Sequence, residues 1–549
     1  MYLAAKRLRR IATHLFQCGA GSCKVRACST SVAVGPTPAD APRFVVLGGS
    51  ISGLTTAYLL QRTLPHAQVH IIEPRSACGG LVHTVQTDSG SVCEQGFYSS
   101  ILVNKSGRET LGLVRLLGMD EDVMSANIEA SARRHLYHRG RVQLVPGIPH
   151  MLQHGPALLL EPVWPRRRGL EDESVHSFVT RRSSTAVADR LADPICRGLF
   201  AADARELSVR MCFPRLWYNE QRFRSVFIGA MLSTIPAYRR RSWMSLDLTD
   251  PLLQRISTGG RCYSFRQGLG TLVNRLLDAL QAPGVGTVPA VVRTSTSVTR
   301  LERQPVLSSS GAAVVKVHLS DGTALAADTV ISALPPWELS SVLQSSDVGS
   351  ESTRQSVCSA LSAAGRRSAA VVNVSYKSDV FREQGWRGAG YFCGSLEEQS
   401  ILGMSWQSQL YPKLGQTRNE SLGDSSVVVY SEGLTEDAAR EASLAALSDH
   451  MKIAVQPSDV RVSVQDVPVY TVGHRDRMLD LNATRLRHMP WLQFVGAGYF
   501  GPRSLADEVI DARELSDVLS RRYARYPDLV ENEVDEDVHR RLCDGFDLP

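Results

Sequence analysis

A glycine turn between an apolar stretch and a helical pattern constrains this chain more than any other feature. Residues 43–53 read RFVVLGGSISG, and the following LTTAYLLQR has the pattern of a helix. A strand that passes through a glycine turn into a helix is the first unit of a dinucleotide-binding α/β fold. The pattern of such turns requires a glycine where this chain has Ser50, so the turn departs from it at one position.

The segment after the helix supports the same interpretation. Residues 68–74, QVHIIEP, predict a second strand, and Glu73 at its end lies 20 residues after Gly53. An acidic residue at about that distance binds the ribose hydroxyls in such folds. The order of these elements, the 20-residue spacing and the acidic residue together predict that the turn holds a nucleotide pyrophosphate. The residues of the turn are Gly48, Gly49, Ser50, Ile51, Ser52 and Gly53.

Ser50 has two expected effects on binding, and they are similar in size. A charge-assisted hydrogen bond from its hydroxyl to a phosphate contributes about 1.5–3 kcal/mol. An unfavourable backbone angle forced on a residue other than glycine costs about 1–2 kcal/mol. The helix amino terminus also offers N–H groups and the positive end of a dipole. We therefore expect binding to persist, and we expect Ser50→Gly to tighten it if strain is present.

The two ends of the chain differ from its middle in charge. Residues 1–39 contain six basic and no acidic side chains, which equals the net charge of +6. The rest is about neutral, so charge gives no reason to expect a nucleic-acid partner. An Arg-rich, acid-free amino terminus predicts a mitochondrial presequence, with a disordered basic tail as the alternative. The acidic segment 526–549 predicts a disordered tail.

Cysteine spacing and hydropathy exclude two further classes. The 11 cysteines include no CxxC pair and no metal-ligand spacing with histidine, so we expect reduced thiols and no metal site. No apolar run is long enough to predict a membrane-spanning helix. Arginine triplets at 166–168 and 239–241 each lie close to a tryptophan. This combination suits the headgroup layer of a membrane, and solvated loops are the alternative.

Strand-turn-helix patterns near both ends of the chain predict an interrupted domain. ADTVISALP at 327–335 and WLQFVGAGYFGP at 491–502 read as strands, and helical patterns cover 259–280 and 505–520. We predict an α/β fold with a discontinuous Rossmann-like domain, an inserted α+β substrate domain and a helical membrane- or substrate-binding segment. The Rossmann-like domain comprises residues 43–125, 255–335 and 470–525; the helical segment is 126–254 and the substrate domain is 336–469.

Residues 194–217, PICRGLFAADARELSVRMCFPRLW, resemble the protoporphyrinogen oxidase family of the animal mitochondrial type. VPVYTVGH at 467–474 and SAAVVNVSY at 368–376 are similar to the same family, and the resemblance covers roughly residues 43–522. It implies an FAD enzyme that oxidises the tetrapyrrole protoporphyrinogen IX to protoporphyrin IX, with oxygen as acceptor and hydrogen peroxide as by-product. It also implies monotopic association with the mitochondrial inner membrane, and a homodimer.

The resemblance also implies site residues. Arg134 would clamp a substrate propionate, with Arg133 as the alternative register and a surface salt bridge as the alternative role. Tyr391 and Phe392 would pack on the macrocycle, unless they are ordinary core residues. No general base can be named, because His176 and His474 are better explained as structural histidines. Further FAD contacts implied by the resemblance are Gly80, Leu81, Gly96, Phe97, Tyr98, Ser99, Val298, Ala497, Arg503, Ser504 and Leu505.

The chain departs from the family pattern at the cofactor site. Besides Ser50, Ala77 stands where the family carries an arginine, and Phe97 and Tyr98 stand where it reads Pro-Arg. The last segment needs a one-residue insertion, and Ala512 takes the place of a glycine. Two alternatives therefore stay open. One is a pseudoenzyme that binds a porphyrin or a partner without turnover, and the other is a related flavin oxidase that acts on an amine.

Overall fold

The structure is a computed structural model. It describes residues 41–87, 92–145, 171–232, 244–247, 249–282, 284, 286–303, 314–415, 425–501 and 504–525. The predicted presequence, the acidic tail, both arginine triplets and Arg503 lie outside the described residues.

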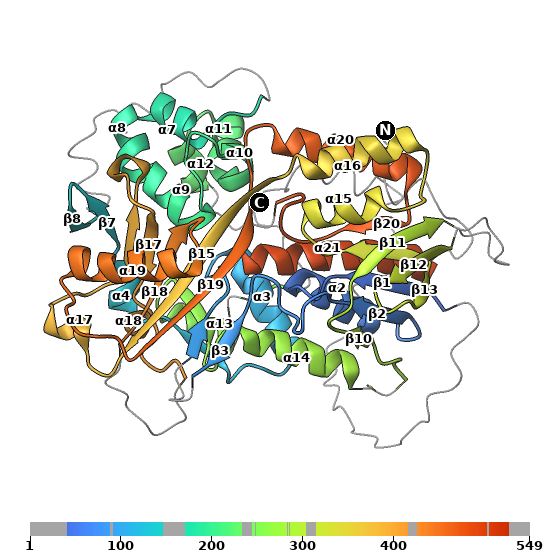
Figure 1. The fold of residues 1–549 in the computed structure, drawn as a ribbon, viewed down its shortest axis with the longest axis horizontal. Coiled ribbons are helices and arrows are strands. Elements are labelled where there is room, and N and C mark those ends of the chain that lie inside the picture. The colour runs from blue at the N-terminus through green and yellow to red at the C-terminus, as the bar shows by residue number, and fades with distance from the viewer. Residues whose placement is uncertain are drawn as a thin grey trace, which may run out of the picture.

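A five-stranded parallel sheet forms one half of the molecule, at the right of Figure 1. At its centre Val46 lies between Ile71 and Ile331 of the neighbouring strands, and such β-branched residues suit a sheet buried on both faces. The strands come from three separated parts of the chain, and the expected α/β class is confirmed. In spatial order they are β10 (Val291–Arg293), β2 (Gln68–Ile72), β1 (Arg43–Leu47), β14 (Thr329–Ser332) and β20 (Leu492–Phe494).

Successive side chains of β1 point to opposite sides of this sheet and are apolar on both. Helices therefore cover both faces. Phe44 and Val46 join one core, and Val45 and Leu47 join the other. The first core lies under α2 (Ile51–Thr63), α3 (Lys105–Leu116), α14 (Gly270–Gln281) and α21 (Leu505–Arg525). The second lies under α15 (Pro336–Gln344), α16 (Glu351–Ser362), α20 (His474–His488) and the small sheet β11 (Val298–Arg303), β12 (Val315–Leu319) and β13 (Ala324–Ala327).

A seven-stranded mixed sheet forms the other half, at the left of Figure 1. One face packs on α19 (Glu436–Met451), and the other carries Tyr430 and faces Leu81 and Phe97. The strands at 135–144 fall in the segment expected to be helical, and they complete this sheet instead. In spatial order the strands are β19 (Asp459–Val469), β15 (Gly365–Tyr376), β18 (Ser425–Glu432), β17 (Ile401–Ser405), β16 (Gly390–Cys393), β7 (His135–His138) and β8 (Arg141–Leu144).

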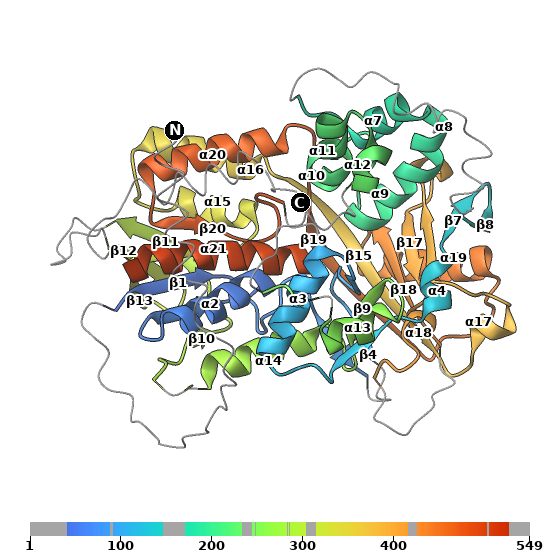
Figure 2. The ribbon, with the colours of Figure 1, turned by 180° about the vertical axis from the view of Figure 1, so that it is seen from behind.

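A cluster of helices caps one end of the seven-stranded sheet, as Figures 1 and 2 show from opposite sides. It has its own apolar core, which includes Phe178, Phe200 and Leu207. Among the described residues, no helix is both long and apolar enough to cross a membrane. The cluster consists of α7 (Val175–Arg182), α8 (Thr185–Val187), the π-helix η2 (Ala188–Ala192), α9 (Asp193–Phe200), α10 (Val209–Cys212), α11 (Pro214–Phe223) and α12 (Val226–Leu232).

The remaining elements of the described chain are short. They are the pair β3 (Thr84–Gln86) and β4 (Val92–Glu94), the sheet of β5 (Ile101–Leu102), β9 (Cys262–Phe265) and β6 (Val123–Ser125), the helices α4 (Ile128–Ala132), α13 (Pro251–Ser257), α17 (Val380–Glu383) and α18 (Gln407–Leu410), and the 3-10 turn η4 (Ser395–Glu397). The seven cysteines in the described part of the chain are free thiols.

Candidate active site

The turn between β1 and α2 has the close packing that a nucleotide-binding turn requires. Gly48 has φ +97°, and a Cβ there would lie 3.1 Å from the backbone of Ala333. A Cβ on Gly53 would lie 2.3 Å from the carbonyl oxygen of Gly48. Both positions therefore exclude a side chain, and the turn can bring backbone N–H groups close to a ligand.

Ser50 is not strained. Its φ of −68° and ψ of 169° lie in the extended region, and it serves as the N-cap of α2. Its Oγ accepts a hydrogen bond from the N–H of Gly53 at 3.4 Å, and its backbone bridges to Gly79. The backbone strain considered from the sequence is therefore absent, because the conformation here is that of a helix cap and not of a left-handed turn.

Glu73 lies beside this turn at the carboxyl end of β2. Its side chain is buried, with Oε2 accepting the N–H of Gly49 at 2.7 Å and Oε1 accepting the N–H of Arg75 at 2.8 Å. Each carboxylate oxygen keeps a further lone pair for a ligand hydroxyl. The segment before Val298 is attached to the same place, since the N–H of Thr296 donates to the carbonyl of Glu73 at 3.1 Å.

The glycine doublet forms the opposite wall of the turn. The N–H of Gly79 donates to the carbonyl of Gly49 at 2.8 Å, and a Cβ on Gly80 would lie 3.0 Å from the Cβ of Ser50. Arg75 donates to the carbonyl of Gly80 at 3.5 Å. Ala77 offers no charge, so Arg75 is the cation that this loop contributes.

Residues 94–99 join the turn to the seven-stranded sheet. A Cβ on Gly96 would lie 2.1 Å from the carbonyl oxygen of Leu81, so these two segments pack backbone to backbone. Phe97 meets Tyr430 edge to face, with ring centroids 5.7 Å apart. Burial raises the pKa of the Tyr430 hydroxyl and Ser99 opposes that rise, so Ser99 also lies near this ring. The structure thus brings Leu81, Phe97 and Ser99 to one face of that sheet.

The carboxy-terminal segment reaches the same place through α21. Ser52 in the first turn of α2 donates to Glu508 at 2.6 Å. Leu505 is buried in the core beneath α2 and α21, and Ser504 is the residue before this helix, bonded to Asp507 at 3.1 Å. Ala497 is half-buried in the connection between β20 and α21.

Tyr98 and Glu508 form the least expected part of the site. Burial raises the pKa of the Tyr98 hydroxyl and of the Glu508 carboxyl, and the two groups lie close enough to influence each other's pKa. Burial also raises the pKa of Asp511 to about 7. A signal for Glu508 exists in the sequence, because it shares the apolar side of α21 with Leu505 and Val509. An acid among such positions indicates a buried functional or structural contact.

Tyr391 and Phe392, both predicted to bind the substrate, lie on opposite faces of the seven-stranded sheet. Tyr391 is buried on the α19 side of the sheet, where its hydroxyl lies 2.7 Å from Nδ1 of His450. Phe392, the next residue of β16, pairs with Gly403, which in turn pairs with Tyr430, so Phe392 shares the face turned towards Phe97. The structure therefore does not bring Tyr391 to the cofactor side.

Arg134 immediately precedes β7 and is exposed. Burial raises the pKa of the Cys262 thiol, and the Arg134 guanidinium opposes that rise, so the two side chains lie near each other. Ser100, which follows the 94–99 segment, also opposes the rise and so lies near the same thiol. The guanidinium is thus placed at the margin of the candidate site and not inside it.

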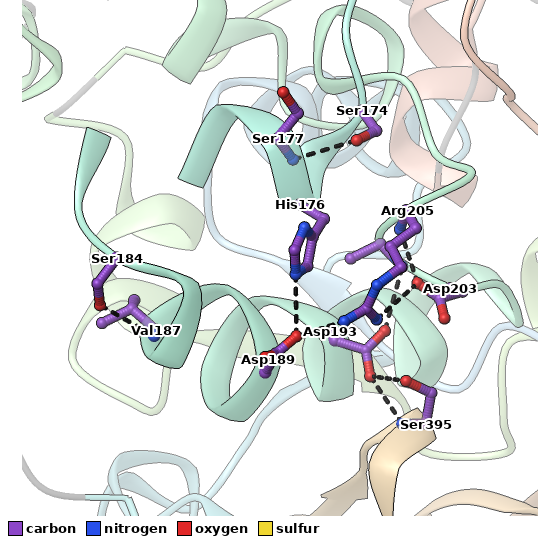
Figure 3. A network of polar contacts seen from close by, with 11 residues as sticks. Ser174, His176, Ser177, Ser184, Val187, Asp189, Asp193, Asp203, Arg205 and Ser395 are labelled. Carbon is purple, nitrogen blue, oxygen red and sulfur yellow. Dashed lines mark hydrogen bonds and ion pairs between the residues drawn. The ribbon is translucent and has the colours of Figure 1, made fainter. Parts of the chain in front are cut away.

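The segment of residues 194–217, whose sequence resembles the protoporphyrinogen oxidase family, folds into the helical cluster. At its start Asp193 is fully buried and accepts the N–H of Ala204 at 3.1 Å and the N–H and hydroxyl of Ser395 at 2.7 and 2.9 Å (Figure 3). This carboxylate fixes α9 to the connection between β16 and β17. The role is one of assembly.

Both histidines considered from the sequence have hydrogen-bond partners. Nε2 of His176 lies 2.9 Å from Asp189, which Arg205 also contacts (Figure 3). Nε2 of His474 lies 2.8 Å from the carbonyl oxygen of Tyr499, and burial lowers the pKa of His474 to about 4. Both contacts are of the kind that a structural histidine makes, and the role of each stays a prediction.

Two surface hollows of the described part of the chain lie away from this turn. One, of about 390 Å³, is lined by residues such as Asn127, Arg266 and Lys413, and another, of about 410 Å³, by residues such as Arg197 and Glu432. Neither includes the turn after β1. The candidate site is therefore defined by its hydrogen-bond donors and acceptors.

Comparison with known proteins agrees with this geometry. The family model described as "Flavin containing amine oxidoreductase" matches residues 51–472. Protoporphyrinogen oxidase of Homo sapiens is 32% identical over 484 residues, covering 83% of this chain and 94% of that protein. Coproporphyrinogen III oxidase of Propionibacterium freudenreichii is 26% identical over 542 residues, covering 87% and 94%.

Solved structures give the fold. Cyclohexylamine oxidase from Brevibacterium oxydans matches with a TM-score of 0.59 and 15% identity, over 88% of this chain and all of that one. The cofactor is FAD, and the residues present fit it. Glu73 suits the ribose, and the N–H groups at the start of α2 suit the pyrophosphate. The chain belongs to the flavin containing amine oxidoreductases and, within them, to the protoporphyrinogen oxidase family.

Proposed function

We propose that this chain oxidises protoporphyrinogen IX to protoporphyrin IX, with FAD as cofactor and oxygen as acceptor, and releases hydrogen peroxide. One observation carries the proposal. Similarity to human protoporphyrinogen oxidase extends over 94% of that protein at 32% identity, and so includes both halves of the fold. Similarity to cyclohexylamine oxidase, at 15% identity, supports only the architecture.

The site has two sides, one that would bind the nucleotide part of FAD and one that would bind the substrate. On the nucleotide side, Glu73 would accept the ribose hydroxyls, and the start of α2 would bind the pyrophosphate. FAD, when bound, supplies the acceptor for the electrons that leave the substrate. The chain's own part is then to bind, to orient and to exclude water, and no described residue of the site is assigned the role of a base.

On the substrate side, we propose that Phe392 and Tyr430 form an apolar wall for the macrocycle. Both lie on the sheet face that packs against Phe97. Arg134 would pair with a propionate, because its exposed guanidinium lies at the margin of the site and can bind a carboxylate through two hydrogen bonds. Tyr391 is left out of this wall, since its hydroxyl is bonded to His450 on the opposite face.

The flavin spectrum tests this function. Purified protein should be yellow, and its flavin bands should bleach without oxygen when protoporphyrinogen IX is added. Coproporphyrinogen III and cyclohexylamine serve as comparison substrates, chosen for the relatives named above. Faster bleaching by either of these would reassign the substrate, and a colourless protein that binds porphyrin would establish a pseudoenzyme.

We also propose that residues 1–39 direct the protein to mitochondria, where it associates with one leaflet of the inner membrane as a homodimer. The basic, acid-free composition of this segment supports the first part. The helical cluster, with the two arginine triplets near it in sequence, is the proposed membrane-facing part. Fusion of residues 1–39 to a fluorescent protein tests the targeting, and a cytosolic signal would contradict it.

A further inference from the structure

Glu94, the first residue of the 94–99 segment, is held by both halves of the molecule. On the side of the parallel sheet, its Oε2 accepts the hydroxyl of Thr84 at 2.7 Å and its Oε1 accepts the N–H of Leu269 at 2.6 Å. On the side of the seven-stranded sheet, its backbone carbonyl accepts Nδ2 of Asn373 at 2.8 Å. The position of the 94–99 segment between the two halves is therefore set at this residue.

The carboxyl contact supplies the cap that α14 lacks. Leu269 is the N-cap residue of this helix, and its side chain makes no capping bond. Glu94 accepts its N–H instead, and Oγ1 of Thr84 accepts the N–H of Gly270 at 2.7 Å. Glu94 is 1% exposed, and a Cβ on Gly268 would lie 2.8 Å from its Oε1. Glu94 is thus closely packed against the start of α14, which satisfies N–H groups that a helix leaves unpaired.

The contact from Asn373 comes from the sheet face that carries the proposed substrate wall. Val371 of β15 belongs to the core that also contains Tyr430 and Phe97. Alternation along the strand places Asn373, two residues further on, on the same face. Asn373 is 5% exposed, and a buried amide requires a hydrogen-bond acceptor, which the carbonyl of Glu94 provides.

A second amide makes a similar contact one residue later. Nε2 of Gln465 donates to the carbonyl of Gln95 at 3.1 Å. Gln465 is half-buried on β19, the strand that pairs with β15. Side chains of two adjacent strands thus hold two successive carbonyls of the 94–99 segment, directly before Gly96, the first residue of the segment that is expected to contact FAD.

We propose that Asn373 is a positioning residue for the oxidation: by holding the carbonyl of Glu94, its amide fixes the 94–99 segment against the sheet face that forms the substrate wall. The expected FAD contacts follow in this segment, so the bond sets the distance between cofactor and substrate. A displacement of about 1 Å between reacting groups can slow a reaction about 100-fold. The inference rests on the proposed function. Asn373 acts through a backbone carbonyl, so it is not a catalytic residue.

Anaerobic stopped-flow reduction of the full chain loaded with FAD tests the positioning. Asn373→Leu keeps the approximate size of the side chain and removes the donor, and an ionised Asn373→Asp side chain has no N–H either. We expect reduction by protoporphyrinogen IX, measured per bound flavin, to slow about 10- to 100-fold in both variants. Reduction by dithionite, which does not use the substrate wall, should stay within about twofold. A merely structural role would lower stability and flavin content and leave the rate per bound flavin unchanged.

Hydrogen exchange of the amides in the 94–99 segment gives a measurement that needs no turnover. Exchange should be about tenfold faster in Asn373→Leu, with or without FAD, because the segment loses a buried hydrogen bond. Gln465→Leu removes the longer and more exposed bond, so it should shift both the exchange and the reduction rate in the same direction by a smaller factor. This variant provides the test if Asn373→Leu does not fold.

Tyr391→Phe is the matched control, because it removes a buried hydrogen bond, that to His450, from the opposite face of the same sheet. Reduction of Asn373→Leu within about twofold of wild type would overturn the proposal. An equal slowing in Tyr391→Phe, or unchanged exchange in the 94–99 segment, would overturn it as well. Failure of the proposed function looks different: protoporphyrinogen IX would leave the wild-type flavin oxidised, while exchange would still be faster in Asn373→Leu.

Discussion

Replacing Ser50 with glycine tests the central question raised by the altered turn. The φ of −68° at Ser50 is ordinary for any L-residue, so glycine relieves no strain. The Ser50 hydroxyl donates to the carbonyl oxygen of Ala333 at 3.5 Å and is not directed at a ligand. What the substitution removes is therefore the helix cap, whose bond to Gly53 is long at 3.4 Å. Replacing an N-cap serine costs a few tenths of a kcal/mol with glycine and about 1 kcal/mol with alanine. Because this bond is long, we expect the loss of stability in both variants to lie towards the low end of these ranges.

The assay combines two measurements on the same protein. Urea unfolding of the Ser50→Gly variant should show a loss of about 0.3 kcal/mol, and of about 0.5 kcal/mol for Ser50→Ala. Fluorescence titration should show FAD affinity within about twofold of wild type for both variants, since a change of about 0.5 kcal/mol in binding free energy corresponds to a factor of about two. Gly48→Ala is the contrasting variant, because a Cβ there meets the backbone of Ala333 at a φ of +97°.

The reasoning fails if Ser50→Gly binds FAD about tenfold more tightly, since that gain of about 1.4 kcal/mol would require strain that the backbone angles lack. It also fails if Gly48→Ala binds as well as wild type. That result would mean that the turn can rearrange to admit a Cβ at Gly48 without a loss of FAD affinity.

Four further outcomes follow from particular contacts. Glu73→Gln should weaken FAD binding by about 1–3 kcal/mol in a fluorescence titration, because its amide cannot accept both backbone N–H groups, and unchanged affinity would remove it from the site. Arg134→Ala should raise KM for protoporphyrinogen IX while flavin content stays constant, and equal loss of both would make it structural. Tyr391→Phe should lower stability by about 1 kcal/mol by leaving His450 unpartnered, with KM unaltered. His474 is neutral when folded, with a pKa of about 4 against 6.5, so stability should fall as pH drops from 6.5 towards 4, and His474→Gln should show a smaller fall in urea unfolding.

The local part of the site was predictable because it depends on near neighbours in the sequence. The turn after β1, the helix α2 and the acid at the end of β2 follow from a pattern within about thirty residues, the length of one such unit. The assumption that failed was that Ser50 inherits the backbone angle of a glycine. Sequence patterns give the residue type at a position, whereas the cap geometry that sets φ depends on where the helix begins.

The long-range part was not predictable for a different reason. Strand β7 pairs in parallel with β16, which lies far along the chain, so nothing local distinguishes 135–138 from the helical segments around it. The same limit applies to Tyr391 and Phe392. Adjacent residues of a strand face opposite sides, and only the pairing with Gly403 and Tyr430 reveals which side faces the cofactor.

The departures from the family pattern gain a common explanation when Tyr98 and Glu508 are considered together. An arginine at position 98 would place a cation beside Glu508 and favour its ionised form. Tyrosine brings no charge to this place, and burial raises the pKa of the Glu508 carboxyl, so the loss of the cation matches the presence of a buried acid. Arg75 still supplies a cation near the glycine doublet. Tyr98 and Glu508 are thus matched in charge, which argues for an altered cofactor site that still binds and against the random loss that a pseudoenzyme would accumulate.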